Sequence, residues 1–99
     1  IKDAARILVR SNYAIVFTGA GVSTESGIPD FRGPQGLWKR VDPEKFTINY
    51  FISDPDEVWG MFIEYFMVHE DVRPNPAHYA IAELERLGIV KSVITQNVD

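Results

Sequence analysis

Two apolar segments of this chain are each followed at once by residues suited to ligand binding, and this arrangement constrains the fold most. The first segment, Ala14–Thr18, leads into Gly19-Ala20-Gly21, and the second, which ends at Thr95, leads into Gln96-Asn97-Val98-Asp99. In open α/β sheets, ligands bind beyond the carboxyl ends of parallel strands, where loops converge. The pattern therefore predicts two parallel strands with a nucleotide site at their shared edge.

The segments outside these strands are predicted to be largely helical. Apolar residues recur at helical spacing between Ile1 and Val9. The stretch Ser53–Glu57 combines a capping side chain, a proline and acidic residues, so we expect a helix from there to about Glu70. A further helix is expected with Asn75 as its cap and a left-handed stop at Gly88.

The spacing of the strands predicts an α/β fold with an inserted lobe. The second strand is expected over Ile89–Thr95, about seventy residues after the first, whereas a parallel crossover needs only a dozen or so. The predicted fold is a partial, Rossmann-like parallel sheet, built from about 1–30 and 74–99, with a mainly helical small lobe over about 31–73. The first strand is nearly all apolar, so we expect helices on both of its faces. A cleft between sheet and lobe would bind the cofactor.

Composition excludes several classes of protein. The 10 basic and 14 acidic residues give a net charge of −4, and Lys39-Arg40 is the only adjacent basic pair, so we expect no direct nucleic-acid binding. No apolar run approaches the ~20 residues of a membrane span. With no cysteine there is no thiolate metal site. We therefore expect an intracellular, cytoplasmic protein, of which this chain, starting at Ile1 and ending at Asp99, is a piece.

The glycine-rich turn by itself supports two interpretations. Gly19 and Gly21 let the backbone approach a phosphate closely, but the usual dinucleotide fingerprint needs a glycine where this chain has Thr24. A lone G-x-G favours a plain tight turn. The string that continues through Ser26-Gly27-Ile28-Pro29-Asp30-Phe31-Arg32 favours a ligand site, because a turn does not require so specific a sequence.

Four motifs of the chain resemble the sirtuin family, the Sir2-like NAD-dependent protein deacylases. Sirtuins carry G-A-G-x-S-x-x-S-G-I-P-D-F-R, then G-L-W, P-N-x-x-H and T-Q-N-x-D. The same motifs occur here in the same order: Gly19–Arg32, Gly36–Trp38, Pro74–His78 and Thr95–Asp99. The match covers nearly the whole chain and identifies it as the N-terminal part of a sirtuin catalytic domain.

The resemblance implies a cofactor-binding role for residues of the first loop. Ala20 and Gly21 would meet the pyrophosphate of NAD, with Thr24 alongside. Phe31 would cover the reactive face of the nicotinamide ribose, and Arg32 would bind the cofactor by charge and hydrogen bonding.

The residues after the second strand would complete the cofactor site. Ile28 and Asp99 would form the nicotinamide pocket, where Asp99 accepts a hydrogen bond from the carboxamide and Val98 contributes backbone. Gln96 would touch the ribose. Asn97, the one catalytic residue that the resemblance implies here, would orient a ribose hydroxyl or a water.

Some residues have a structural interpretation as well. Asp30 could bind the cofactor or only organise its own loop through Asx-type hydrogen bonds, while His78, early on its helix, is expected to be structural. Alignment with sirtuins that prefer acidic acyl groups puts Phe62 and Tyr65, and no arginine, at the acyl-binding positions. Neutral acyl groups, acetyl foremost, are therefore expected.

The implied activity is deacetylation of protein lysines, in which the acyl group passes to ADP-ribose and nicotinamide is released. A mono-ADP-ribosyltransferase on the same scaffold and a non-catalytic NAD-binding or interaction module are the alternatives. The family's catalytic histidine and four zinc-binding cysteines are absent from these residues. We therefore expect an enzyme with an acetylated-lysine partner when complete, zinc bound elsewhere in it, and no activity from this chain alone.

Overall fold

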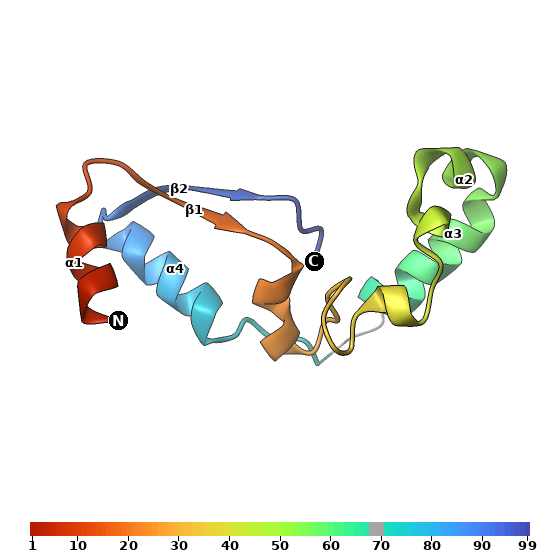
Figure 1. Cartoon of the computed structure of the whole chain (residues 1–99), viewed down its shortest axis with the longest axis horizontal. Coiled ribbons are helices and arrows are strands. Elements are labelled where there is room, and N and C mark those ends of the chain that lie inside the picture. Colours follow the sequence, from red (N-terminus) through yellow and green to blue (C-terminus); the bar gives the residue numbers. More distant parts are fainter. Residues whose placement is uncertain (68–70) are drawn as a thin grey trace.

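Two parallel strands, one from the first fifth of the chain and one from near its end, lie side by side. In the computed structural model, which describes residues 1–67 and 71–99, β1 (Ala14–Thr18) pairs with β2 (Val90–Thr95). The register aligns Thr18 with Thr95, with one irregularity between Ala14 and Ile15. Both strands therefore end at the same edge, and the predicted parallel pairing is confirmed (Figure 1).

Helices lie against only one face of this sheet. In Figure 1, α4 (Pro76–Arg86) runs beneath the strands. The helix α1 (Lys2–Arg10) lies at the end of the strands that is farther from the lobe. On the opposite face, Ile15 is 51% exposed and Phe17 is 73% exposed. The described residues therefore leave this face largely open, and its cover by helices stays a prediction for the complete protein.

The ends of α4 follow the local rules that the sequence indicates. Asn75 is the N-cap: its side chain accepts a hydrogen bond from the backbone N–H of Ala77 at 2.9 Å, and Pro76 occupies the first position. Beyond the helix, Gly88 adopts a left-handed φ of +74°, which favours glycine. Both predicted ends of this helix are confirmed.

Short helices build the lobe, on the right of Figure 1. In chain order they are η2 (Leu37–Lys39), η3 (Pro43–Phe46), α2 (Ile48–Ser53), α3 (Pro55–Phe62) and a π-helical turn, η4 (Ile63–Met67). The Asp54 carboxylate caps α3 by accepting from the Glu57 N–H at 3.1 Å. The helix predicted to reach Glu70 changes to π geometry after Phe62. Its expected end, which includes His69 and Glu70, lies outside the described residues. No described helix has the length and apolar character needed to cross a membrane.

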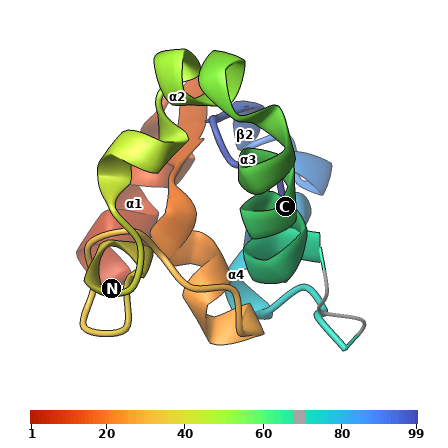
Figure 2. The same ribbon diagram turned by 90° about the vertical axis from the view of Figure 1, so that its right-hand side faces the viewer.

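Aromatic rings connect the lobe to the loop that follows β1. From Phe31 one series passes to Trp38 and Phe46, with ring centroids 4.9 Å and 5.4 Å apart. Another passes from Phe31 to Phe66 and Phe62 at 6.2 Å and 5.2 Å. Such pairs add to the stability that area burial alone provides. Figure 2 views the molecule from the side of the lobe, with α2 and α3 toward the viewer.

A charged cluster joins three elements of the lobe. The Glu57 carboxylate of α3 pairs with the Lys45 ammonium of η3 at 2.5 Å and accepts a hydrogen bond from the Tyr50 hydroxyl of α2. The hydrogen bond from Lys45, and then that from Tyr50, lowers the pKa of Glu57 below its ordinary value of 4.5. In turn the Glu57 carboxylate raises the pKa of Lys45.

The lowered pKa of Glu57 predicts a pH dependence of stability. A carboxyl with a lowered folded-state pKa stabilises the protein above its unfolded pKa, and that contribution disappears as the pH falls through the folded value. We expect Glu57→Gln to lower the melting temperature at pH 7. The difference in melting temperature between the variant and the unmodified protein should become smaller below about pH 4.5. Thermal unfolding between pH 3 and 8 measures this, with the exposed Glu44→Gln as control. A difference that is constant across this range would contradict the assignment.

Candidate functional site

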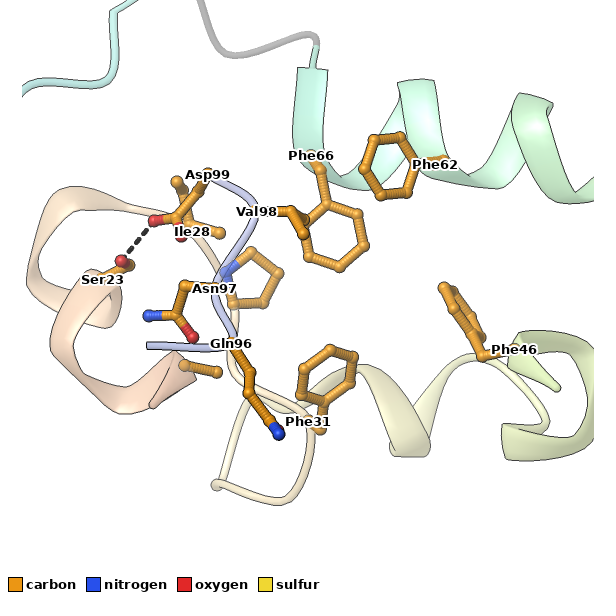
Figure 3. Close-up of a pocket in the computed structure, with 12 residues that line it drawn as sticks. Ser23, Ile28, Phe31, Phe46, Phe62, Phe66, Gln96, Asn97, Val98 and Asp99 are labelled. Carbon is orange, nitrogen blue, oxygen red and sulfur yellow. Dashed lines mark hydrogen bonds between the residues drawn. The ribbon is translucent and has the colours of Figure 1, made fainter. Parts of the chain in front are cut away.

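The loops after β1 and β2 are bonded to each other where the strands end. The Asn97 side-chain amide donates to the Gly19 carbonyl at 2.9 Å. The Ser23 hydroxyl, on the 3-10 helix η1 (Ala20–Ser26), donates to the Asp99 carboxylate (Figure 3). Ser23 is 2% exposed. The two predicted loops therefore form one structural unit.

A cavity of about 190 Å³ lies between these loops and the lobe. Figure 3 shows polar side chains of Ser23, Asn97 and Asp99 on one side and phenylalanine rings on the other. The lining residues are Ala20, Ser23, Ile28, Pro29, Phe31, Phe46, Phe62, Phe66, Gln96, Asn97, Val98 and Asp99. A ligand with a flat apolar ring and a hydrogen-bonding substituent would match both sides.

A second, more open hollow of about 460 Å³ adjoins the glycine turn. It shares Ala20, Phe31, Gln96 and Asn97 with the first cavity, so the two are parts of one cleft. Its other lining residues are Phe17, Thr18, Gly19, Gly21, Asp30 and Arg32. The Arg32 guanidinium is the basic group of this hollow, which suits an anionic part of a ligand.

Backbone hydrogen bonds close the segment that carries Phe31. The N–H of Leu37 donates to the Asp30 carbonyl at 2.8 Å, and the N–H of Trp38 donates to the Phe31 carbonyl at 3.0 Å. The Asp30 carboxylate accepts from the Gly33 N–H at 2.9 Å. Asp30 therefore organises its own loop, as one of the two interpretations expects, and its contact with a cofactor stays a prediction.

Nearly all the residues predicted to bind the cofactor line this cleft. Those in it are Gly19, Ala20, Gly21, Ile28, Asp30, Phe31, Arg32, Gln96, Asn97, Val98 and Asp99. Thr24 is the exception: it borders a different hollow, and its hydroxyl donates to the Gly21 carbonyl at 2.9 Å. In this structure Thr24 stabilises the turn.

Several lining residues were not assigned to the site from sequence. Ser23 belongs to the first motif, and its place within the G-A-G-x-S string was an available signal. Phe46 and Phe66 come from the lobe, and apart from their apolar character the sequence did not indicate that they line the site. They reach the cleft only because the lobe folds back over the loops.

The two lobe residues compared with acyl-binding positions separate in the structure. Phe62 lines the cavity, but Tyr65 borders the other hollow, beside Asp30, Arg40 and Glu64. Tyr65 therefore lines a different hollow from Phe62, and its match to an acyl-binding position stays a prediction. The π-helical turn Ile63–Met67 begins between the two residues and changes the direction of the side chains after Phe62.

A family model for the Sir2 family matches residues 19–99. The chain belongs to the Sir2 family. Among curated relatives, it is 61% identical over 99 residues to NAD-dependent protein deacetylase 1 of Pyrobaculum aerophilum, and covers 39% of that protein. It is 55% identical over 98 residues to the NAD-dependent protein deacetylase of Saccharolobus solfataricus, covering 99% of this chain and 40% of that protein.

Solved Sir2 structures share the fold of this chain. One, solved in work on the mechanism and regulation of Sir2 enzymes, has a TM-score of 0.89 and 56% identity over 99% of this chain and 39% of that chain. Another, a Sir2 with a p53 peptide and NAD+, has a TM-score of 0.84 and 39% identity over 98% of this chain and 38% of that chain. The Rossmann-like fold class is therefore confirmed, and the chain spans about two-fifths of its relatives' length.

The closed segment around Phe31 predicts a strict requirement for glycine at position 36. A Cβ on Gly36 would lie 2.4 Å from the Phe31 carbonyl oxygen, so Gly36→Ala has to displace that backbone. We expect a loss of about 1–3 kcal/mol of stability, as for other overpacked sites. Thermal or urea unfolding of the protein measures it.

Gly60→Ala is the matched control for this variant. A Cβ on Gly60 would meet nothing within 4 Å, and alanine within a helix is favoured over glycine by roughly 0.5–1 kcal/mol. We expect Gly60→Ala to be neutral or stabilising. Equal stability of the two variants would contradict the tight closure at Gly36.

Proposed function

We propose that the protein that carries this chain is an NAD-dependent protein-lysine deacetylase. Its reaction would transfer the acyl group of an acetylated lysine to ADP-ribose and release nicotinamide. The relatives' names as NAD-dependent protein deacetylases and deacylases support this over mono-ADP-ribosyl transfer and over a non-catalytic NAD-binding module. Since this chain spans about two-fifths of their length, the activity is proposed for the complete protein.

The observation that carries the proposal is the two-sided cavity with Asp99 at its polar end. Ser23 donates to Oδ2 of Asp99, and among the described residues Oδ1 has no hydrogen-bond partner. Ile28, 7% exposed, and the phenylalanine rings provide the apolar side. Nicotinamide is a flat ring with a carboxamide, so its amide N–H could be accepted by Asp99 while the ring packs on Ile28. The residues present therefore fit the nicotinamide end of NAD.

The glycine turn fits the pyrophosphate end. A Cβ on Gly19 or Gly21 would meet nothing within 4 Å, so packing inside this chain does not require either glycine. An absent side chain at such a position instead leaves the backbone open to close approach by a ligand. With Ala20 between them and Arg32 on the same hollow, we propose this surface for the phosphates.

Asn97 is proposed as the catalytic residue of this chain. Its Nδ2 donates to the Gly19 carbonyl at 2.9 Å, which fixes the side chain at the junction of the two hollows. The amide oxygen can then accept a hydrogen bond from a ribose hydroxyl or a water. Gln96 and Val98, its neighbours in the cleft, would contact the ribose and the nicotinamide.

Other parts of the proposal concern the complete protein. We propose that 1–99 is the N-terminal part of a catalytic domain, with Rossmann-like elements at about 1–30 and 74–99 and the lobe at about 31–73. The partner would be an acetylated-lysine protein or peptide, and a Sir2 at 39% identity has been solved with a p53 peptide. Zinc is proposed only outside this chain, which has no cysteine. For the compartment we propose the cytoplasm.

Asp99→Asn tests the nicotinamide pocket. The substitution keeps the shape and an oxygen for Ser23, but turns an NH₂ toward the incoming carboxamide, so the acceptor is lost. A hydrogen bond to a charged group contributes roughly 1.5–3 kcal/mol, so nicotinamide exchange and deacylation should both fall about tenfold to a hundredfold. Exchange of labelled nicotinamide into NAD, with an acetyl-lysine peptide present, measures this. Glu25→Gln, an exposed acid on η1, is the control, and exchange unchanged by Asp99→Asn would remove Asp99 from the site.

The isolated 99-residue polypeptide tests the need for the rest of the protein. Its sheet exposes Ile15 and Phe17 on one face, and the family's general base matches neither of its histidines. We expect weak folding alone, weak NAD binding, and no deacylation of an acetyl-lysine peptide above a protein-free blank. Turnover would instead assign the base to a residue present here, with His78 or Asn97 the candidates.

A further inference from the structure

Asn75 makes hydrogen bonds in two directions although it is the cap of a helix. It is 6% exposed. Its Oδ1 accepts from the N–H of Ala77 at 2.9 Å, which caps α4. Its Nδ2 donates to the Val22 carbonyl at 2.7 Å and to the Ser26 hydroxyl at 3.0 Å, both on η1.

The cap alone does not explain an asparagine. A helix cap needs only a side-chain acceptor, which serine, threonine and aspartate also supply. Asparagine has in addition an NH₂ group with two donors, and here both donors have acceptors on a segment about fifty residues earlier in the chain. The backbone N–H of Asn75 donates to His78 Nδ1 at 3.1 Å, which fixes the backbone from which this side chain projects.

The segment that Asn75 bonds carries the partner of Asp99. Val22, whose carbonyl accepts from Asn75, directly precedes Ser23, whose hydroxyl donates to the Asp99 carboxylate. Ser23 is buried, so its position follows that of the η1 backbone. The same α4 that Asn75 begins leads into β2 and so to Asp99. Asn75 therefore ties together the two chain segments that meet at the carboxylate.

We propose that Asn75 is a positioning residue for nicotinamide recognition, acting through Val22 and Ser23 on the Asp99 carboxylate. The proposal rests on the proposed function, since it assigns Asn75 a part in that same site. Loss of the Nδ2 bonds would let η1 shift, and the orientation of the Asp99 oxygens would no longer be fixed. The effect falls on nicotinamide, because the acyl-lysine peptide would not contact these groups.

Asn75→Asp separates the two directions of bonding. Aspartate keeps an acceptor for the Ala77 N–H and is itself a favoured cap, but it has no donor for Val22. Asn75→Ser is a second variant without a charge: serine also caps a helix, and its side chain is too short to reach Val22. Asp54→Ala is the matched control, because the Asp54 side chain caps α3 and its loss removes a side-chain cap without touching η1.

In the complete protein, we expect both Asn75 variants to raise the nicotinamide inhibition constant about tenfold, in line with one or two lost neutral hydrogen bonds. The KM for the acetyl-lysine peptide should stay unchanged. Asp54→Ala should lower the melting temperature and leave both constants as they are. A purely structural role would lower the active fraction of all three variants and change neither constant, and that result would overturn the proposal.

Amide hydrogen exchange separates this inference from the proposed function. Backbone amides of Ala20–Ser26 should exchange faster in Asn75→Asp than in the unmodified protein, and not in Asp54→Ala. If the unmodified protein shows no NAD-dependent activity, the proposed function fails. The exchange measurement still tests whether the hydrogen bonds from Asn75 hold η1 in place. Unchanged exchange of the η1 amides would overturn the positioning role of Asn75, whatever the activity of the protein.

Discussion

The parallel pairing of β1 with β2 is the constraint on which the rest of this structure depends. Because Thr18 lies opposite Thr95, the residues after each strand leave the sheet at the same level. The Asn97 amide can then reach the Gly19 carbonyl, and the Ser23 hydroxyl can reach Asp99. Antiparallel pairing would put the two loops at opposite edges, and no cleft could form between them.

The lobe supplies the other half of the cleft, and its chemistry is different. The strand-end loops contribute all the amide, hydroxyl and carboxylate groups, with Ile28 and Val98 beside them, whereas the lobe contributes phenylalanine rings (Figure 3). Phe31 belongs to the loop and also contacts rings of the lobe. Closure of its segment onto Leu37 and Trp38 gives that ring a defined position. A ligand that is polar at one end and flat and apolar at the other finds both surfaces already in place.

Buried polar groups connect the residues of this cleft to η1 and α4. Asn75 and Ser23 are the buried polar residues among those described, and each bonds across a long separation in sequence. A buried polar group has a strong requirement for its partner, because an unsatisfied one costs about 1–3 kcal/mol. These bonds therefore fix how η1 and α4 meet, which apolar packing alone would define less sharply. The lobe depends more on aromatic contacts and on the partly exposed Glu57 cluster.

Sequence alone determined the elements whose causes are local, and tertiary structure decided the rest. The strand Ala14–Thr18, the Asn75 cap and the Gly88 stop follow from neighbouring residues, and the strand-end rule located the polar half of the cleft. The change to π geometry after Phe62, the separation of Tyr65 from Phe62 and the second direction of bonding at Asn75 did not follow. The bonds of Asn75 join groups about fifty residues apart, and periodicity and capping rules describe only residues within a few positions of each other. Those rules also assume regular α geometry, which the chain leaves after Phe62.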